Sequence, residues 1–273
     1  MESESLTGSA ALDTVRSVRE RAGGMPRPFA WLLLWGAVLI SAYLGVWLFI
    51  SAVGPSSTWV TISLLLPTVL LYSLLVQGAR ERFGSRLRFR RTTVAVAVAA
   101  IVLVFFGLGG ISLFGGGYPW WIAPLFTGIA LVILGAKPAL LLLRHRTCEG
   151  SGDPWRSSPL GLPAKVLTSA FGCFFGLSVG LGGAPIAQWA LTMAGLLLFV
   201  VAASAPRARW GIARAGYEWG RLHWIAFGVT VAAVYAVAIV GSVAPSPPVA
   251  VSIACGILIA IPLIVAALLP RPH

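Results

Sequence analysis

The sequence predicts an all-α, polytopic helical membrane protein: eight transmembrane helices arranged as four tandem hairpins, with both termini in the cytoplasm. Three observations lead to this prediction. The chain is 58% hydrophobic and only 10% charged, it contains eight apolar runs of about membrane length, and its basic residues are confined to alternate connections. Soluble domains have roughly a quarter of their residues charged. Such a composition, with a mean hydropathy of +0.90, is typical of a chain in a bilayer.

Each apolar run is long enough for one helix to cross the hydrocarbon. A crossing helix needs about 20 mainly apolar residues, and only helices or closed barrels pair every backbone group in lipid. The runs lack the alternation of strands, which favours helices. The predicted spans are 30–53, 58–78, 93–115, 119–136, 166–183, 186–205, 222–243 and 248–269.

A short turn with proline divides each pair of spans. The four turns are centred on Pro55, Pro119, Pro185 and Pro245, at spacings of 64, 66 and 60 residues. Glycine permits a tight backbone there, and proline begins a helix without needing its missing N–H. The sequence therefore predicts an N-terminal tail, 1–27, and one transmembrane domain, 28–273, with possible repeats at about 28–91, 92–157, 158–221 and 222–273.

The two middle hairpins share Phe-Phe-Gly-Leu, at 105–108 and at 174–177. Aligning their turns requires a three-residue gap. Duplication of one hairpin and convergence of an apolar chain on hairpin chemistry both account for this similarity.

Charge predicts the orientation of the hairpins. All twenty Lys and Arg residues lie outside the four proline turns, and positively charged connections remain on the cytoplasmic side. We therefore expect a multi-pass protein of the cell (cytoplasmic) membrane with the turns outside. Aromatic residues should mark the inner interface, at Trp31, Trp210, Trp219 and Trp224.

The N-terminal tail does not resemble a signal peptide, because it is acidic in places and no small-residue cleavage site follows the first span. Leu12, Val15 and Val18 form a weak helical stripe. This segment is expected either to lie on the inner leaflet or to be a solvated tail.

The residues needed for intramembrane chemistry are missing from the predicted spans. All eight acidic residues fall in tails or loops, whereas proton and cation pathways use buried acids or histidines. Histidine and cysteine positions predict no metal, cofactor or disulfide site. Lys137 is expected at the inner surface with its ammonium group snorkelling, followed by a short interfacial helix over 139–143. We predict that the protein is not an enzyme.

A Gly-x-Ser-x-Gly pattern over 176–180 matches serine hydrolases, but that motif requires a strand-to-helix turn and a nearby histidine. Here it lies inside a predicted helix, with Ser178 and His223 near opposite membrane faces. Gly172, Gly176 and Gly180 instead recur every four residues and predict a smooth stripe for helix packing. Ser41 and Gly45 form a weaker example.

Prolines within spans indicate where a ligand could bind. Pro67, Pro124 and Pro262 each remove a helical hydrogen bond and can kink a helix. Candidate ligand-lining residues near these prolines and in neighbouring spans are Pro67, Tyr72, Pro124, Thr127, Gln188 and Tyr235. The alternative is structural, because proline is common in transmembrane helices whose neighbours satisfy the backbone.

The net charge of +12 predicts binding of membrane lipids, including anionic headgroups at the inner face. It also fits an acidic protein partner or a homo-oligomer, whereas nucleic acid is disfavoured because this charge pattern is general for membrane proteins. Two functions remain: the membrane subunit of a transporter or multisubunit complex, energised by a docked partner, or a lipid-binding or assembly scaffold without transport activity.

Overall fold

A computed structural model describes residues 26–53, 58–83, 91–113, 117–144, 155, 160–182, 184–204, 208, 210–244 and 248–269. Within these ranges every regular element is a helix. The helices are α2 (Arg27–Val53), α3 (Thr58–Arg82), α4 (Arg91–Leu113), α5 (Ile122–Arg144), α6 (Leu162–Gly180), α7 (Pro185–Ser204), α8 (Ile212–Glu218), α9 (Arg221–Val243) and α10 (Val249–Leu268). The all-α prediction is confirmed for the described residues, and the stripe at Leu12, Val15 and Val18 lies outside them.

Five of the described helices are long and apolar enough to cross a membrane: α2, α5, α6, α9 and α10. The remaining predicted spans coincide with α3, α4 and α7. In α4 and α7 the apolar helical segments, Val98–Ile111 and Trp189–Val201, are shorter than a membrane span. The structure thus agrees with a multi-pass membrane protein, while the count of eight spans stays a prediction.

Two elements differ from the sequence prediction. The predicted span 119–136, with an interfacial helix after it, is instead one helix, α5, that continues through Pro138 to Arg144. Lys137 lies on this helix with its side chain exposed. The segment between the sixth and seventh predicted spans, expected to be a loop, contains the seven-residue helix α8.

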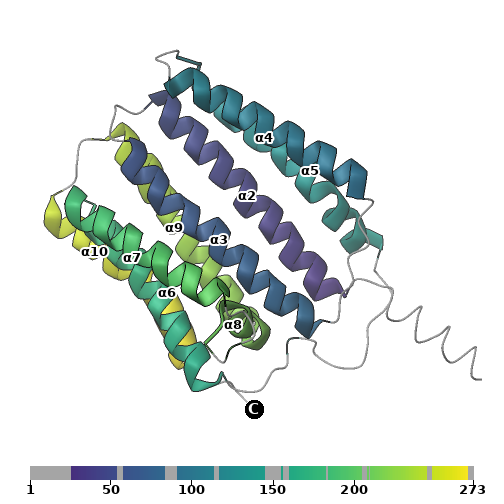
Figure 1. Ribbon diagram of the computed structural model, residues 1–273, viewed down its shortest axis with the longest axis vertical. Coiled ribbons are helices and arrows are strands. Elements are labelled where there is room, and N and C mark those ends of the chain that lie inside the picture. The colour runs from purple at the N-terminus through teal and green to yellow at the C-terminus, as the bar shows by residue number, and fades with distance from the viewer. Residues whose placement is uncertain are drawn as a thin grey trace, which may run out of the picture.

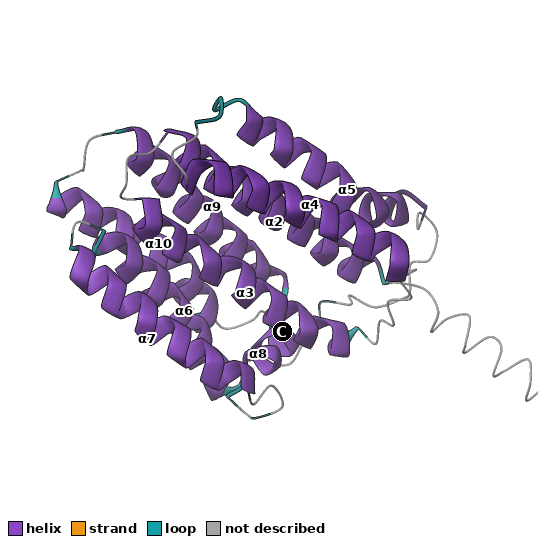
Figure 2. Ribbon diagram, turned by 45° about the horizontal axis from the view of Figure 1, so that its top comes forward, coloured by secondary structure: helices purple, strands orange, loops and turns teal. Residues whose placement is uncertain are grey.

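The helices form layers around α2, α3 and α9. Figures 1 and 2 show α4 and α5 beside α2, and α6, α7 and α10 beyond α3 on the opposite side. Among the residues that the structure describes, the most extensive contacts join α6 to α10, α2 to α5 and α3 to α8. Because none of these pairs belongs to a single predicted hairpin, contacts between hairpins define the fold at least as much as contacts within them.

Glycines bring α6 and α10 into backbone contact. A Cβ atom added at Gly172 would lie 2.9 Å from the carbonyl oxygen of Ala260, and one added at Gly176 would lie 2.6 Å from the carbonyl oxygen of Gly256. At Gly180 the nearest atom, Cα of Ile253, would be 3.8 Å away, an ordinary contact. The stripe on α6 therefore faces α10, most tightly at its first two glycines.

Small residues perform the same role between α2 and α5. A Cβ atom at Gly45 would overlap the hydroxyl group of Thr127, and one at Gly135 would lie 3.7 Å from Cβ of Ala37. Ser41, one turn before Gly45, is buried on α2. In lipid, such close approach supplies the van der Waals contact that drives helix association.

Aromatic rings occupy glycine notches at other helix pairs. Trp47 of α2 packs on Gly109 of α4, where a Cβ atom would lie 2.5 Å from the ring, and Phe174 of α6 packs on Gly195 of α7. The two Phe-Phe pairs differ in environment. Phe105 is buried and Phe106 exposed, whereas Phe175 is fully buried and Phe174 is half-buried.

We predict that Gly176→Ala lowers the free energy of unfolding by about 1–3 kcal/mol, because the new methyl group overpacks a backbone contact. Gly180→Ala should be tolerated. The matched control is Gly128→Ala on α5, where nothing lies within 4 Å of an added Cβ atom. Unfolding in mixed micelles by denaturing detergent measures the difference, and equal stability of the Gly176 and Gly128 variants would contradict the prediction.

Candidate functional site

Three of the sequence-predicted ligand-lining residues lie on α3 and α9, two helices in contact with each other. Tyr72 of α3 and Tyr235 of α9 are buried in the largest core cluster, and Pro67 lies half-buried on α3. Tyr72 donates a hydrogen bond to the carbonyl oxygen of Leu32, so it joins α3 to α2.

Tyr235 bonds to the residue that follows Pro67. The hydroxyl of Thr68 donates to the carbonyl of Leu65 at 2.6 Å, and the oxygens of Thr68 and Tyr235 lie 2.8 Å apart. Because the threonine hydroxyl has a single proton, the Tyr235 hydroxyl is the donor in the second bond. These hydroxyl groups are therefore satisfied by one another and by backbone.

Pro124 and Thr127 belong to a different part of the bundle, where α5 packs on α2. Pro124 is exposed in the first turn of α5, where its missing N–H costs no helical hydrogen bond. Thr127 donates to the carbonyl of Ala123 at 2.8 Å beside Gly45. The side chain of Gln188 lies outside the described residues. The predicted lining residues thus do not share one site.

The sequence analysis missed a packed junction at the end of the bundle where α3 finishes and α6 and α9 begin. Here α8 crosses α3 at backbone distance. Cβ atoms added at Gly78 and at Gly216 would overlap the backbone of Ala213 and of Leu75, respectively. Ile212 and Ala215 are 1% exposed. The available signal was the pair Arg214 and Glu218, spaced for an i,i+4 ion pair on a helix.

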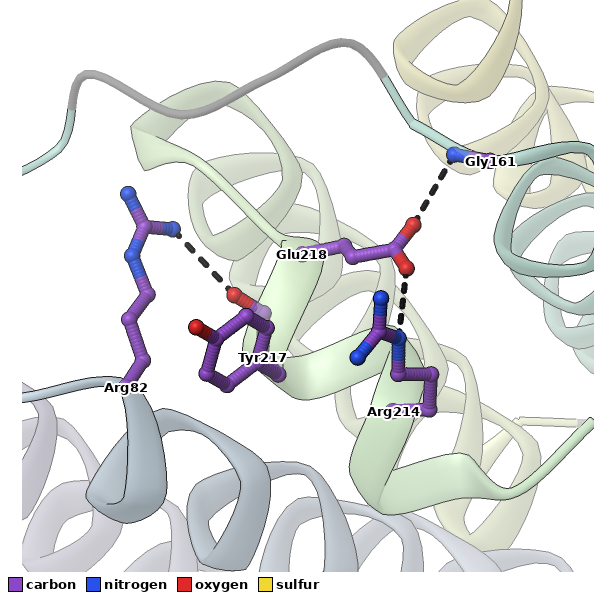
Figure 3. A network of polar contacts seen from close by, with 5 residues as sticks. All are labelled: Arg82, Gly161, Arg214, Tyr217 and Glu218. Atoms are coloured by element: carbon purple, nitrogen blue, oxygen red, sulfur yellow. Dashed lines mark hydrogen bonds and ion pairs between the residues drawn. The ribbon is translucent and has the colours of Figure 1, made fainter. Parts of the chain in front are cut away.

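Polar contacts join α8 to α3 and to the start of α6 (Figure 3). The guanidinium of Arg82, on the last turn of α3, donates to the carbonyl of Trp219 at 2.7 Å and to that of Tyr217 at 3.4 Å. It therefore caps the carboxyl end of α8, whose carbonyls have no helical partner.

Glu218 makes two contacts of its own. Its carboxylate accepts from the backbone N–H of Gly161 at 2.9 Å and from Nε of Arg214 at 2.8 Å. The Glu218 side chain is only 13% exposed. Because Gly161 directly precedes α6, this carboxylate links α8 to the start of α6.

A buried indole completes the junction. Trp219, predicted at the membrane interface, is 0% exposed. Its Nε1–H donates to the hydroxyl of Thr168 on α6 at 2.9 Å. The Trp219 ring lies against Trp224 at 5.2 Å and Phe227 at 5.8 Å between centroids. This part of the predicted aromatic belt is therefore core, whereas Trp31 and Trp210 are exposed.

His223 has a structural position in the same junction. Its Nδ1 accepts from the backbone N–H of Gly220 at 3.3 Å, and its ring stacks on Trp219. Ser178 is buried near the far end of α6, whereas His223 lies in the first turn of α9. Since α6 and α9 both start at this junction, serine and histidine are at opposite ends, and they do not form a hydrolase pair.

The described residues contain no group of three or more His, Cys, Asp or Glu side chains placed to hold a metal ion. A hollow of about 280 Å³ lies instead between α6 and α10, lined only by apolar groups and glycines. Cys173, Leu177 and Ile257 border this groove and are exposed. Its chemistry suits hydrocarbon and not an ionic ligand.

No protein-family model, curated protein or solved structure matches this chain.

We predict that Trp219→Phe and Thr168→Val each destabilise the protein and that their effects are coupled. A net hydrogen bond contributes about 1 kcal/mol, and leaving one buried partner alone costs more. A double-mutant cycle on unfolding in micelles should give a coupling energy of about 0.5–1.5 kcal/mol. The control pair is Phe227→Leu and Thr168→Val. Because these two residues share no hydrogen bond, their effects on the free energy of unfolding should be nearly additive. Additivity of the first pair would contradict the assignment.

Proposed function

We propose that the chain is the integral membrane subunit of a transporter or other multisubunit membrane complex. A partner supplies energy or catalysis and docks at the basic end, which is the end of the bundle where α3 finishes and α6, α8 and α9 begin. In this proposal the chain crosses the cell membrane eight times as four hairpins, with both termini and all basic connections on the cytoplasmic side. The apolar helices support membrane insertion, and the absence of basic residues from the four turns supports the orientation.

The observation that carries the docking proposal is the α8 junction. A connection that is rich in arginine would be expected to be solvated, yet α8 is packed on α3 and capped by Arg82. Arg214 and Tyr217 of α8, and Trp210 just before this helix, are all exposed, with the Arg214 guanidinium 5.3 Å from the Tyr217 ring. Arginine and aromatic residues are enriched in protein interfaces, and a rigid platform costs a partner little ordering entropy.

The interior also favours a subunit over a self-contained pump. The buried hydroxyls of Thr68, Tyr72 and Tyr235 are bonded within the protein. Described acidic side chains, Glu81 and Glu218, lie at the basic end. A proton or cation pathway ordinarily requires ionisable groups inside the bundle.

The alternative function is a lipid-binding or assembly scaffold without transport activity. The apolar groove between α6 and α10 supports it, because its exposed border of Cys173, Leu177 and Ile257 suits acyl chains or another apolar helix. A continuous polar cavity in a complex with its partner would favour transport, and a solidly packed bundle with ordered lipids would favour the scaffold.

The proposed topology predicts which engineered cysteines are labelled from each side. In a variant without Cys148, Cys173 and Cys255, cysteine at Gly117, Ala184 or Ala244 should react with an impermeant maleimide outside intact cells. Cysteine at Tyr217 or Leu269 should react only after permeabilisation. All five positions are exposed, so a lack of reaction reports sidedness. Labelling of the first group only from the cytosol would refute the topology.

The docking proposal predicts contact with one protein at α8. A photoreactive amino acid at Trp210 or Tyr217 should give, in native membranes, a single protein adduct of the same mass from both positions. Its yield should fall as salt is raised to about 0.5 M, because exposed ionic contacts are screened. The control is Val265, exposed on α10. If neither Trp210 nor Tyr217 gives a protein adduct, or if Val265 gives the same adduct, the proposal fails.

A further inference from the structure

The beginnings of α2 and α9 lie side by side and form an exposed surface of unusual composition. Phe29 and Leu32 of α2 share a buried cluster with Trp224 of α9. Farther along, Gly228 of α9 faces the ring of Trp35 of α2, with 3.6 Å between the ring and an added Cβ atom. The missing side chain at Gly228 thus leaves a notch that the tryptophan borders.

The contact between Trp35 and Gly228 sets the relative depth of the two helices. Trp35 follows the first residue of α2 by eight positions, and Gly228 follows the first residue of α9 by seven. At about 1.5 Å per residue, Arg27 and Arg221 begin their helices at almost the same level. Both arginine side chains are exposed.

Apolar side chains continue directly below the two arginines. Trp31 and Trp35 are 47% and 53% exposed on α2, and Ile225 and Val229 are 58% and 52% exposed on α9. Leu222 is exposed in the same stripe of α9. From Leu222 to Ala232, which is also exposed, the stripe covers about 15 Å, which is half the thickness of the hydrocarbon.

We propose that this α2–α9 surface is a binding site for one anionic phospholipid of the inner leaflet. The guanidinium groups of Arg27 and Arg221 receive the phosphate and any further negative charge of the headgroup. One acyl chain lies along Leu222, Ile225 and Val229 against the ring of Trp35. Cations directly above a stripe of exposed apolar side chains complement a phospholipid, which joins a charge to hydrocarbon in the same order.

An acidic soluble protein matches this surface less well, because it would contact the two arginines but not the apolar side chains below them. The inference rests on the membrane placement proposed above, but it does not depend on a partner at α8.

The experiment uses the purified full chain in micelles with equal amounts of dioleoylphosphatidylglycerol and dioleoylphosphatidylcholine, and native mass spectrometry counts the retained lipids. We expect phosphatidylglycerol to be retained preferentially. Arg27→Gln and Arg221→Gln should each lower that preference about fivefold, and together about 25-fold, which corresponds to the usual attraction per basic residue. The double Arg→Lys variant keeps the charge and should keep most of the preference.

The matched control is Lys137→Gln, which removes another exposed cation from α5 and should leave lipid retention unchanged. Equal retention of the two lipids, an equal loss in the Lys137 variant, or displacement of the lipid by inorganic phosphate alone would overturn the proposal. So would capture of a protein, and not of phospholipid, by a photoreactive group at Trp31. If no protein is crosslinked from Trp210 or Tyr217 while lipid retention is normal, only the proposed docking of a partner is refuted.

Discussion

Close backbone approach between helices is the constraint on which the rest of this structure depends. In lipid, apolar side chains gain little by leaving one hydrocarbon environment for another, so helices associate through van der Waals contact and interhelical hydrogen bonds. Gly172 and Gly176 supply that contact for α6 and α10, and Gly78 and Gly216 supply it for α3 and α8. Each pair brings together segments that are distant in the sequence.

The hydrogen bonds follow from this packing. Once α8 lies on α3, the guanidinium of Arg82 reaches the last carbonyls of α8, and Glu218 reaches the backbone of Gly161. The indole of Trp219 then has Thr168 as its partner. A buried polar group costs free energy unless it is bonded, so these contacts fix one arrangement of the basic end. The proposed docking depends on this fixed arrangement, because it holds the exposed side chains of Arg214, Trp210 and Tyr217 in place.

The two proposed surfaces use the same basic end in different ways. The outer face of α8 offers cations and aromatic rings on a rigid element, which fits a protein. The beginnings of α2 and α9 offer cations above a descending apolar stripe, which fits a phospholipid. In both cases the tightly packed interior serves to hold the surface in place, and the buried hydroxyls of Thr68 and Tyr235 stabilise that interior.

The sequence by itself determined the helical class and most helix boundaries, because backbone groups in lipid must pair within their own segment and apolar length marks such segments directly. It also indicated the small-residue stripe on α6 through its period. Tertiary structure alone decided that this stripe faces α10, that α8 packs on α3, and that Tyr72 and Tyr235 lie apart from Pro124 and Thr127. Those outcomes depend on which distant helices meet, and neither local hydropathy nor spacing along one segment carries that information.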